Sequence, residues 1–299
     1  MKTGFNFRFR QLRNVHFFGL LVAVGIIFVS CAKDEVIADS NTQQLTIRMN
    51  DNPVSDLTNV WLDIAVVEVK VDTSSVEGTN DDKYKDDSDD DDKDKKSDKF
   101  GKWVSIGFTP GLYDLLKFRN GIDTVLASGT LPKGRIHKVR VTLGSNSQVS
   151  KDKGLTKLPL DICSGKPYVY VIIKNEHLDK INTNHSKIQL DFDLASSIKV
   201  DNGKYCLKPV VHSYSEKSCG KIEGSVLPKE AMSVPMAFNE TDTAYAKPED
   251  DGKYKITGLK PGIYSVKFNP SNGYKDSVLT QVIVYADNET KLGAVTLSK

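Results

Sequence analysis

Apolar and polar residues alternate with a period of two in several short segments of the chain. The clearest segment, KIQLDFDLA at 187–195, has apolar side chains on one side (Ile188, Leu190, Phe192, Leu194) and polar ones on the other (Lys187, Gln189, Asp191, Asp193). The alternation recurs at 138–143 and 264–268, while 61–71 and 168–174 are runs of β-branched and aromatic residues. Such segments are typical of β-strands with one buried face.

Turns rich in glycine and proline separate these segments, and helical periodicity is weak, with 112–118 as the one short helical candidate. Many short strands joined by such turns favour packed antiparallel sheets over a parallel sheet covered by helices. One set of strands ends near 212–224 and a new set begins there. We therefore expect an all-β protein with two antiparallel β-sandwich domains, at 43–215 and 219–299.

The first thirty residues follow another pattern. Residues 1–14 carry four basic side chains and no acid, and 17–29 form an uncharged, mostly apolar run. A run of about thirteen residues is too short for a membrane-spanning helix, which needs roughly twenty. A basic segment followed by a short apolar one is typical of an export signal. Residues 1–30 are predicted to be a signal peptide and 31–42 a tether.

The end of this signal, Phe28-Val29-Ser30-Cys31, resembles the bacterial lipobox, with Phe28 where leucine is usual. The resemblance implies a lipoprotein whose mature chain begins at Cys31 and carries a diacylglycerol and an amide-linked acyl chain such as palmitate. Two or more acyl chains hold a protein stably on a membrane. The alternative is an ordinary secretory signal in which the cysteine is incidental.

Lys33, Asp34 and Glu35 follow the cysteine almost directly. This charged triplet resembles the export tag with which some Gram-negative bacteria carry lipoproteins across the outer membrane. It implies a protein anchored in the cell outer membrane through lipid on Cys31 and facing outward. A charged tether without an export role is the alternative.

Net charge limits the class of partner. Residues 1–30 carry four of the positive charges and no acid, so the formal net charge changes from +2 for the whole chain to −2 for residues 31–299. A near-neutral protein of this kind lacks the basic surface that nucleic-acid binding requires. We therefore expect no nucleic-acid partner.

Residues 81–100 read DDKYKDDSDDDDKDKKSDKF and lie between two predicted strands. Such a run cannot bury apolar surface, so 78–100 is predicted to be a disordered hairpin loop. Calcium is the alternative, because acidic loops supply the oxygen ligands that it prefers. The run lacks the DxDxDG pattern, however, and its lysines compete for the carboxylates. We expect no metal and no cofactor.

Three cysteines follow Cys31, at positions 163, 206 and 219. A disulfide is permitted outside the cytoplasm, and three cysteines allow one intramolecular bond at most. Cys206 and Cys219 flank the predicted domain boundary and form a plausible pair. A bond between Cys163 and either of them stays open.

A set of landmarks in the first domain resembles the DUF4382 domain of bacterial lipoproteins. The segments that carry the resemblance are LTIRMNDNP (45–53), VWLDIAVVEVKV (60–71), Trp103, YDLL (113–116), NG (120–121), LASGTLPKGRIHKVRVTLGSN (126–146), LDFDLASSIKV (190–200) and GKYCLKPVV (203–211). The chain departs from the family by its acidic insertion and by Cys206. The resemblance implies an extracytoplasmic β-sandwich with no assigned activity.

The second domain contains GKIEGSVLP (220–228) and DGKYKITGLKPGIYSVKFNP (251–270). These segments resemble carboxypeptidase-regulatory-like, transthyretin-like sandwiches, which share a carbohydrate-binding-like fold. The resemblance implies a turn at Asp251-Gly252 and inward-facing Tyr254 and Ile256. It says little about function, because many proteins share such a fold.

Catalytic motifs such as GxSxG, HExxH and the P-loop do not occur, and the histidines are scattered. Asp191 and Asp193 are the strongest pair of carboxylates, because period two places them on one strand face, where they could serve acid–base chemistry. The same positions are also the solvent face of an amphipathic strand. We expect no enzyme.

Saccharide sites stack sugar rings on exposed aromatic side chains. Tyr245 and Tyr274 of the second domain stand in polar surroundings and are the candidate ligand-binding residues, whereas Tyr264 alternates as a core residue would. The sequence predicts a non-enzymatic, lipid-anchored cell-envelope protein that acts in binding, adhesion or assembly, with a glycan or an envelope protein as partner. The alternative is a carbohydrate-binding accessory lipoprotein that uses the second domain.

Overall fold

The computed structural model describes residues 41–52, 57–74, 101–163 and 166–299, all within one unit of the chain, Ala38–Lys299. The predicted signal peptide, Cys31 and the tag at Lys33, Asp34 and Glu35 lie outside the described residues. So does the acidic segment 78–100. These expectations stay predictions.

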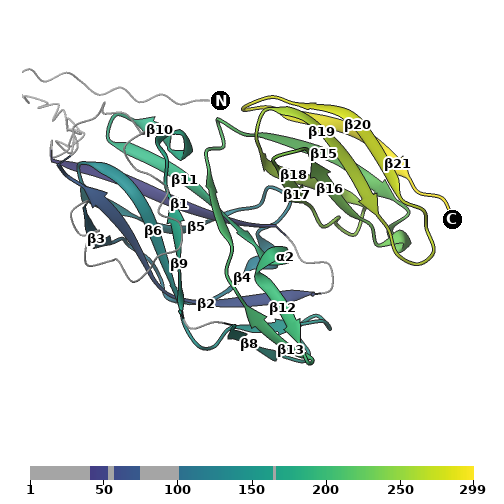
Figure 1. Cartoon of the computed structure of the whole chain (residues 1–299), viewed down its shortest axis with the longest axis horizontal. Helices are drawn as coiled ribbons and strands as arrows, with labels where there is room; N and C mark the ends of the chain where they lie inside the picture. The colour runs from purple at the N-terminus through teal and green to yellow at the C-terminus, as the bar shows by residue number, and fades with distance from the viewer. Residues whose placement is uncertain (1–40, 53–56, 75–100, 164–165) are drawn as a thin grey trace, which may run out of the picture. The chain divides into compact units, whose positions relative to one another are not determined.

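The described chain is nearly all β-structure, as the strand pattern predicts (Figure 1). Strands β1–β14 form two sheets, which we call the N-terminal sandwich. The first has the order β10 (Asp179–Asn182), β11 (His185–Asp193), β1 (Thr42–Asn52), β5 (Thr124–Pro132), with β14 (Val211–Tyr214) also paired to β11. The second has the order β12 (Ile198–Asp201), β13 (Lys204–Leu207), β8 (Leu158–Ile162), β7 (Gln148–Ser150), β2 (Asn59–Asp72), β6 (Arg135–Leu143), β9 (Tyr168–Ile172), with β3 (Lys102–Ser105) and β4 (Gly111–Asp114) also paired to β2.

One hydrophobic core holds the two sheets of the N-terminal sandwich together. The parallel pairing of β1 with β11 places Ile47 beside Ile188 and Met49 beside Leu190. These side chains are buried in the same cluster as the inward residues of the second sheet, which include Leu62, Ile64, Val67, Val69, Val139 and Val141. The alternation predicted at 187–195 is confirmed for its apolar face.

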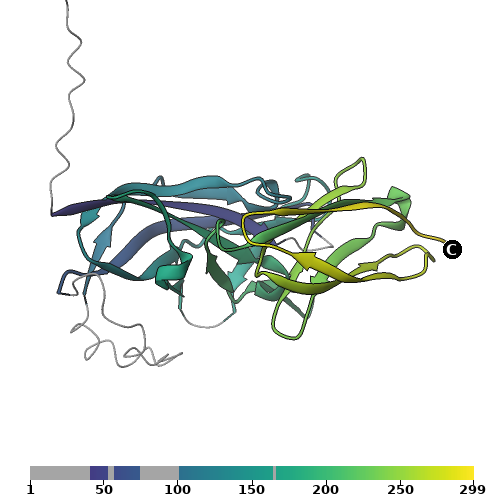
Figure 2. The ribbon, with the colours of Figure 1, turned by 90° about the horizontal axis from the view of Figure 1, so that it is seen from above.

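The C-terminal sandwich consists of β15–β21, drawn in light green to yellow in Figure 2. One sheet has the order β18 (Lys253–Leu259), β15 (Gly220–Leu227), β21 (Glu289–Thr296), and the other β17 (Thr243–Tyr245), β16 (Val234–Phe238), β19 (Gly262–Asn269), β20 (Ser277–Val284). A second cluster that shares no residue with the first forms its core and includes Ile222, Tyr254, Ile256, Tyr264, Val266 and Phe268. The inward positions predicted for Tyr254, Ile256 and Tyr264 are confirmed.

The turn before β18 depends on glycine. Gly252 has φ +83°, a left-handed conformation that side-chain-bearing residues rarely adopt. A Cβ at this position would lie 2.5 Å from the carbonyl oxygen of Val226. Conformation and space both require glycine in the predicted Asp251-Gly252 turn.

Helical structure is confined to single turns in the described ranges: η3 (Leu115–Lys117), η4 (Asn175–His177), α2 (Leu194–Ser197) and η5 (Lys229–Ala231). The helix expected at 112–118 is only partly present, because β4 occupies residues up to Asp114 and η3 follows it. Within the same ranges, none of the helices has the length and hydropathy needed to cross a bilayer.

Candidate functional site

The tyrosines predicted to bind ligand are only partly accessible. Tyr274 lies between β19 and β20, packs against the core of the C-terminal sandwich, and has the Lys299 ammonium 5.0 Å from its ring centroid. Tyr245 is half-buried on strand β17, paired with Met236. More exposed than either is Tyr285, with 60% of its surface accessible.

A larger group of aromatic side chains lies on the outer side of the second sheet of the N-terminal sandwich. We call this surface the aromatic face; its members are Glu68, Lys70, Trp103, Lys138, Arg140, Tyr168 and Tyr170. They come from β2, β3, β6 and β9, and β3, β6 and β9 lie together in Figure 1. Sequence analysis did not identify this surface.

The strand pattern explains why these side chains point outward. Val69, Val139 and Val171 alternate with them and are buried in the core, so their neighbours project from the opposite side of the sheet. The register of the strands then places these side chains next to one another across the sheet, since Lys70 pairs with both Trp103 and Lys138.

The three rings of the aromatic face form one continuous group. Trp103 stacks on Tyr170, with ring centroids 5.7 Å apart and planes at 25°, and Tyr168 follows at 5.1 Å from Tyr170. All three residues are half-buried. Offset stacking of this kind is a favourable aromatic arrangement.

Cations lie over these rings. The Arg140 guanidinium is 4.4 Å and the Lys70 ammonium 5.7 Å from the Trp103 ring centroid, and the Lys138 ammonium is 5.8 Å from that of Tyr170. Such distances are those of cation–π interactions. Lys70 is buried beneath the rings, whereas Lys138 and Arg140 are half-buried.

Among the described residues that we assign to the aromatic face, Glu68 supplies a carboxylate. It accepts a hydrogen bond from Arg140 Nε at 2.7 Å and forms an ion pair with the same guanidinium at 2.6 Å. Burial lowers the pKa of Arg140, but hydrogen bonds with Glu68 and Tyr170 outweigh burial and raise it overall. Glu68 therefore neutralises part of the charge of Arg140.

The predicted carboxylate pair has a different environment from the one expected. Gln189, assigned to the solvent face of the same strand, is only 2% exposed, so this part of the prediction is wrong. β11 is paired on both edges, by β1 on one side and by β10 and β14 on the other, and Gln189 Nε2 donates to Asp123 at 2.6 Å. Polar side chains of other segments therefore cover Gln189, whereas Lys187, Asp191 and Asp193 on the same side are half-buried.

Asp191 and Asp193 have separate roles. The Asp193 carboxylate accepts a hydrogen bond from the Ser196 N–H at 2.9 Å and caps α2. Burial, followed by the charge of Asp193, raises the pKa of Asp191 to about 7. Among the described residues, no group of three or more His, Cys, Asp or Glu side chains is arranged to hold a metal ion.

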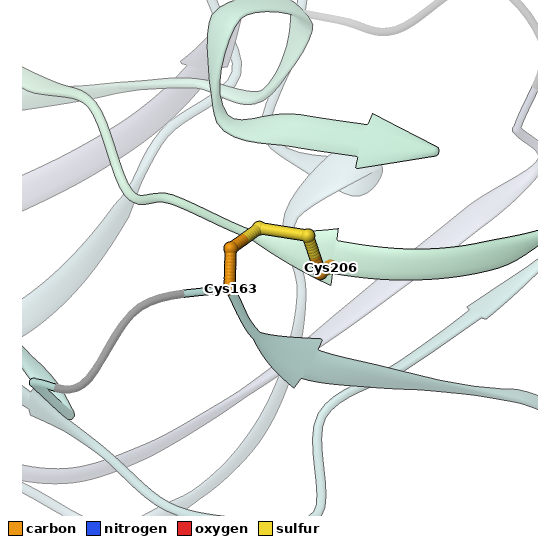
Figure 3. The surroundings of a disulfide bond; sticks show 2 residues. All are labelled: Cys163 and Cys206. Carbon is orange, nitrogen blue, oxygen red and sulfur yellow. A yellow bond between two sulfur atoms is a disulfide. The ribbon is translucent and has the colours of Figure 1, made fainter. Parts of the chain in front are cut away.

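The disulfide joins Cys163 and Cys206 (Figure 3), so the expected pair of Cys206 with Cys219 is wrong. β8 and β13 run parallel side by side, with Asp161 opposite Cys206, which brings Cys163 to a Cα–Cα distance of 4.9 Å from Cys206. Cys219 is a buried free thiol at the start of the C-terminal sandwich. Proximity along the sequence did not predict the pair, because sheet pairing determines which cysteines meet.

The C-terminal sandwich has a surface groove of about 350 Å³. Its lining combines apolar and polar side chains: Phe238, Asn239, Glu240, Ile263, Tyr264, Ser265 and Gln281. Neither Tyr245 nor Tyr274 lines it.

A family profile described as "Domain of unknown function (DUF4382)" matches residues 42–209. No curated protein matches the sequence. The resemblance of the second domain to carboxypeptidase-regulatory-like sandwiches stays a prediction.

Solved structures that the chain matches include a cohesin–X-dockerin complex from Acetivibrio cellulolyticus, at 19% identity and a TM-score of 0.22, over 26% of this chain and 56% of that chain. The minor pilin GBS52 of Streptococcus agalactiae is similar at 13% identity and a TM-score of 0.21, over 86% and 96%. A carbohydrate-binding module of Eubacterium rectale Amy13K in complex with maltoheptaose is similar at 12% identity and a TM-score of 0.19, over 85% and 95%. At these scores the similarities carry no argument about function.

Proposed function

We propose that this chain, which belongs to the DUF4382 family, is a non-enzymatic, lipid-anchored protein of the cell envelope that binds a partner outside the cytoplasm. The observation that carries the binding role is the aromatic face, where three contacting rings and their cations lie on the outer side of a sheet. Large apolar side chains gathered on a surface mark interaction sites more often than isolated ones do.

Sequence features support the anchoring part of the proposal. The basic and apolar segments of residues 1–30 and the lipobox-like end at Phe28–Cys31 fit an exported lipoprotein. Lys33, Asp34 and Glu35 fit outward display from the outer membrane. An anchored module that extends from the membrane would hold its binding surface within reach of envelope or external partners.

The carboxylates support a binding role over catalysis. Asp193 is used as a helix cap, and Asp191 lies within a strand that is paired on both edges. A general base must reach a substrate proton directly or through one water. A carboxylate already engaged as a helix cap, as that of Asp193 is, suits structure better than proton transfer.

A second candidate function is a carbohydrate-binding accessory role for the C-terminal sandwich. The groove beside Phe238 and Gln281 favours it, because saccharide sites combine an apolar surface with a few polar groups. Tyr245 and Tyr274 would then act at other points of the same sandwich.

Protease shaving of intact cells tests the location, with immunoblotting for the C-terminal sandwich and a periplasmic protein as control. Rapid loss of signal is the expected result, and full protection would overturn outward display. Replacement of Lys33, Asp34 and Glu35 by Ala should then make the protein resistant to shaving of intact cells. Cys31→Ala should leave an unprocessed or released protein in membrane fractionation, and normal retention of that variant would contradict the anchor.

A further inference from the structure

We propose that the free edge of β20 pairs with β20 of a second copy of this chain, antiparallel and about a two-fold axis. The four-stranded sheet of the C-terminal sandwich then continues into the same sheet of the second copy. Self-association at β20 goes beyond the proposed function, because the aromatic face lies on the other sandwich and does not depend on it.

β20 lies at one end of the sheet order β17-β16-β19-β20, so one of its edges has no neighbouring strand in the sheet (Figure 1). Among the described residues, its backbone forms hydrogen bonds only with β19, apart from the Ile283 carbonyl, which accepts a bond from Thr290 Oγ1 at 2.6 Å. Such an edge presents a row of N–H and C=O groups to which another strand can bind.

Other strands at sheet edges in the described ranges are short, charged or covered. β18 and β21 contain charged side chains, and six strands have four residues or fewer: β3, β4, β10, β12, β14 and β17. The outer edge of β5 is bonded by the Ser128 N–H to the Gly107 carbonyl, and in β9 the Ile172 carbonyl accepts a bond from Ser213 Oγ. Short length and charge are common ways in which sheets block edge pairing. β20 has neither, with eight residues and no charged side chain.

A β-bulge interrupts β20 at its centre. Val282 pairs with Tyr264 and Leu279 with Val266, so Thr280 and Gln281 together lie opposite Ser265. Gln281 has φ +59°, which fits the irregular backbone of a bulge. The extra residue changes the alternation of side chains, so that the two halves of the strand no longer follow one period of two.

As a result, the order of inward and outward side chains in β20 reads the same from both ends. Residues that pair directly in antiparallel strands share a face. The pairs with β19 therefore give the pattern inward, outward, inward on each side of the bulge, at Ser277, Val278 and Leu279 before it and at Val282, Ile283 and Val284 after it.

This symmetry is the reason for naming a second copy as the partner. A two-fold axis between Thr280 and Gln281 reverses the order of the residues and keeps each side chain on its face. It places Val278 opposite Ile283 of the second copy and Leu279 opposite its Val282. No other register pairs the strand over its full length with matching faces, because a shift by one residue exchanges inward and outward positions.

Charge and polarity are consistent with pairing between identical strands. A charged side chain near a two-fold axis would lie close to its own copy, and 277–284 contains none. Outward-facing Val278 and Ile283 are 47% and 46% exposed, and Ile263, which pairs with Ile283, is 54% exposed. Charged groups usually select a foreign partner. A neutral, apolar edge lacks that means of selection but suits its own copy.

Engineered cysteines test the pairing in purified, detergent-solubilised full-length protein that carries Cys219→Ala. Val278→Cys combined with Ile283→Cys should form disulfides between copies under copper–phenanthroline oxidation, because Cα atoms of opposite residues are about 4.5–5.5 Å apart. Each single variant should stay uncrosslinked, since the axis separates identical positions by five residues, or roughly 16 Å. Non-reducing gel electrophoresis measures the dimer. Ile181→Cys, at an exposed position on edge strand β10, controls for random collision.

Lysine substitutions test the same edge without oxidation. Val278→Lys and Ile283→Lys should each weaken dimerisation by roughly tenfold or more in sedimentation velocity, because a charge on an edge strand opposes pairing. Ile181→Lys makes the same change on β10 and should dimerise as the parent protein does. Far-UV circular dichroism checks folding, and the cysteine variants give an independent result if a lysine variant fails to fold.

Four results would overturn the proposal: a parent protein that is monomeric at its highest soluble concentration, a dimer that survives both Val278→Lys and Ile283→Lys, equal crosslinking of the single and double cysteine variants, or equal crosslinking of Ile181→Cys. Because these measurements use purified protein, they are independent of shaving and fractionation. Failure of the β20 pairing thus leaves the anchored binding protein standing, and the reverse also holds.

Discussion

In the C-terminal sandwich Tyr254, Tyr264 and Phe268 are buried in the core, whereas the rings of the N-terminal sandwich's aromatic face lie on the outer side of a sheet. The core of the N-terminal sandwich is mainly Leu, Ile and Val. Among the described residues, the C-terminal sandwich has seven strands and the N-terminal sandwich has fourteen. Small domains bury a smaller fraction of their surface than large ones. Large rings supply much of its core volume, while the larger sandwich fills its core with aliphatic residues and has aromatic residues on its surface.

The largest effect on stability should come from truncation of an aromatic side chain in the core of the C-terminal sandwich. Phe268 is fully buried and meets Tyr254 edge to face at 5.9 Å, so Phe268→Ala should cost about 3–5 kcal/mol of unfolding free energy. Both tryptophans, Trp61 and Trp103, belong to the N-terminal sandwich. In urea denaturation, Phe268→Ala should therefore lower the midpoint of the transition seen by far-UV circular dichroism. The midpoint of the tryptophan fluorescence transition should stay as in the parent protein.

Val278→Ala is the control for that experiment, since Val278 is 47% exposed in the same sandwich and should change stability little. A coincident shift of both signals in Phe268→Ala would show that the two sandwiches unfold as one unit. The two cores would then not contribute to separate free energies of unfolding.

Removal of the disulfide should have the next largest effect, and in the other sandwich. The Cys163–Cys206 bond closes a sequence separation of 43 residues beside the β8–β13 pair. Cys163→Ser combined with Cys206→Ser should lose about 2–4 kcal/mol, and the loss should appear in the tryptophan fluorescence transition. Cys219→Ala retains the bond and is the control. An unchanged midpoint in the double variant would mean that the strand pairing alone determines the stability of that edge.

Asp191 makes the stability of the N-terminal sandwich depend on pH. Its folded-state pKa of about 7 lies above the ordinary 3.8, so between these values the unfolded chain has released a proton that the folded chain retains. The carboxyl group therefore costs nothing below about pH 4, and its penalty grows as pH rises to about 7. Asp191→Asn should raise the Tm by a few degrees at pH 8 and leave it unchanged at pH 4.

Asp251→Asn in the C-terminal sandwich should change the Tm in the opposite direction, with a small decrease at neutral pH. Hydrogen bonds with Lys253 lower the pKa of the exposed Asp251 carboxyl group, so its small contribution is present at neutral pH and is lost on acidification. A gain in Tm for Asp191→Asn that is equal at pH 4 and pH 8 would contradict the proton linkage.

Loss of a ring from the aromatic face should have the smallest effect on stability. Cation–π and stacking contacts are each worth about 0.5–1.5 kcal/mol and do not simply add. Trp103→Ala removes such contacts with Tyr170, Arg140 and Lys70, so it should destabilise by about 1–2 kcal/mol, against the larger loss in Phe268→Ala. Circular dichroism follows this variant, because the substitution removes one of the two fluorophores. A loss as large as that of Phe268→Ala would assign Trp103 to structure and remove the contrast between core and surface rings.

The alternation of residue types along the strands was readable from the sequence alone, because it depends only on local backbone geometry. It predicted the all-β class, the buried faces at Ile188, Leu190 and Phe192, and the inward Tyr254 and Tyr264, all of which the structure confirms. The strands that flank the acidic segment were also readable, since β2 ends at Asp72 and β3 begins at Lys102.

Tertiary structure decided what the alternation leaves open, which is the set of strands that become neighbours. Gln189 is buried because the side chains of Asp123 and Glu216, distant in the sequence, lie against it, and Cys163 reaches Cys206 because β8 runs beside β13. Trp103 and Tyr170 are far apart in the sequence and stack only because β2 and β6 bring their strands into one sheet. A period of two assigns a residue to a face, whereas contacts on that face depend on long-range pairing and register, which no local pattern encodes.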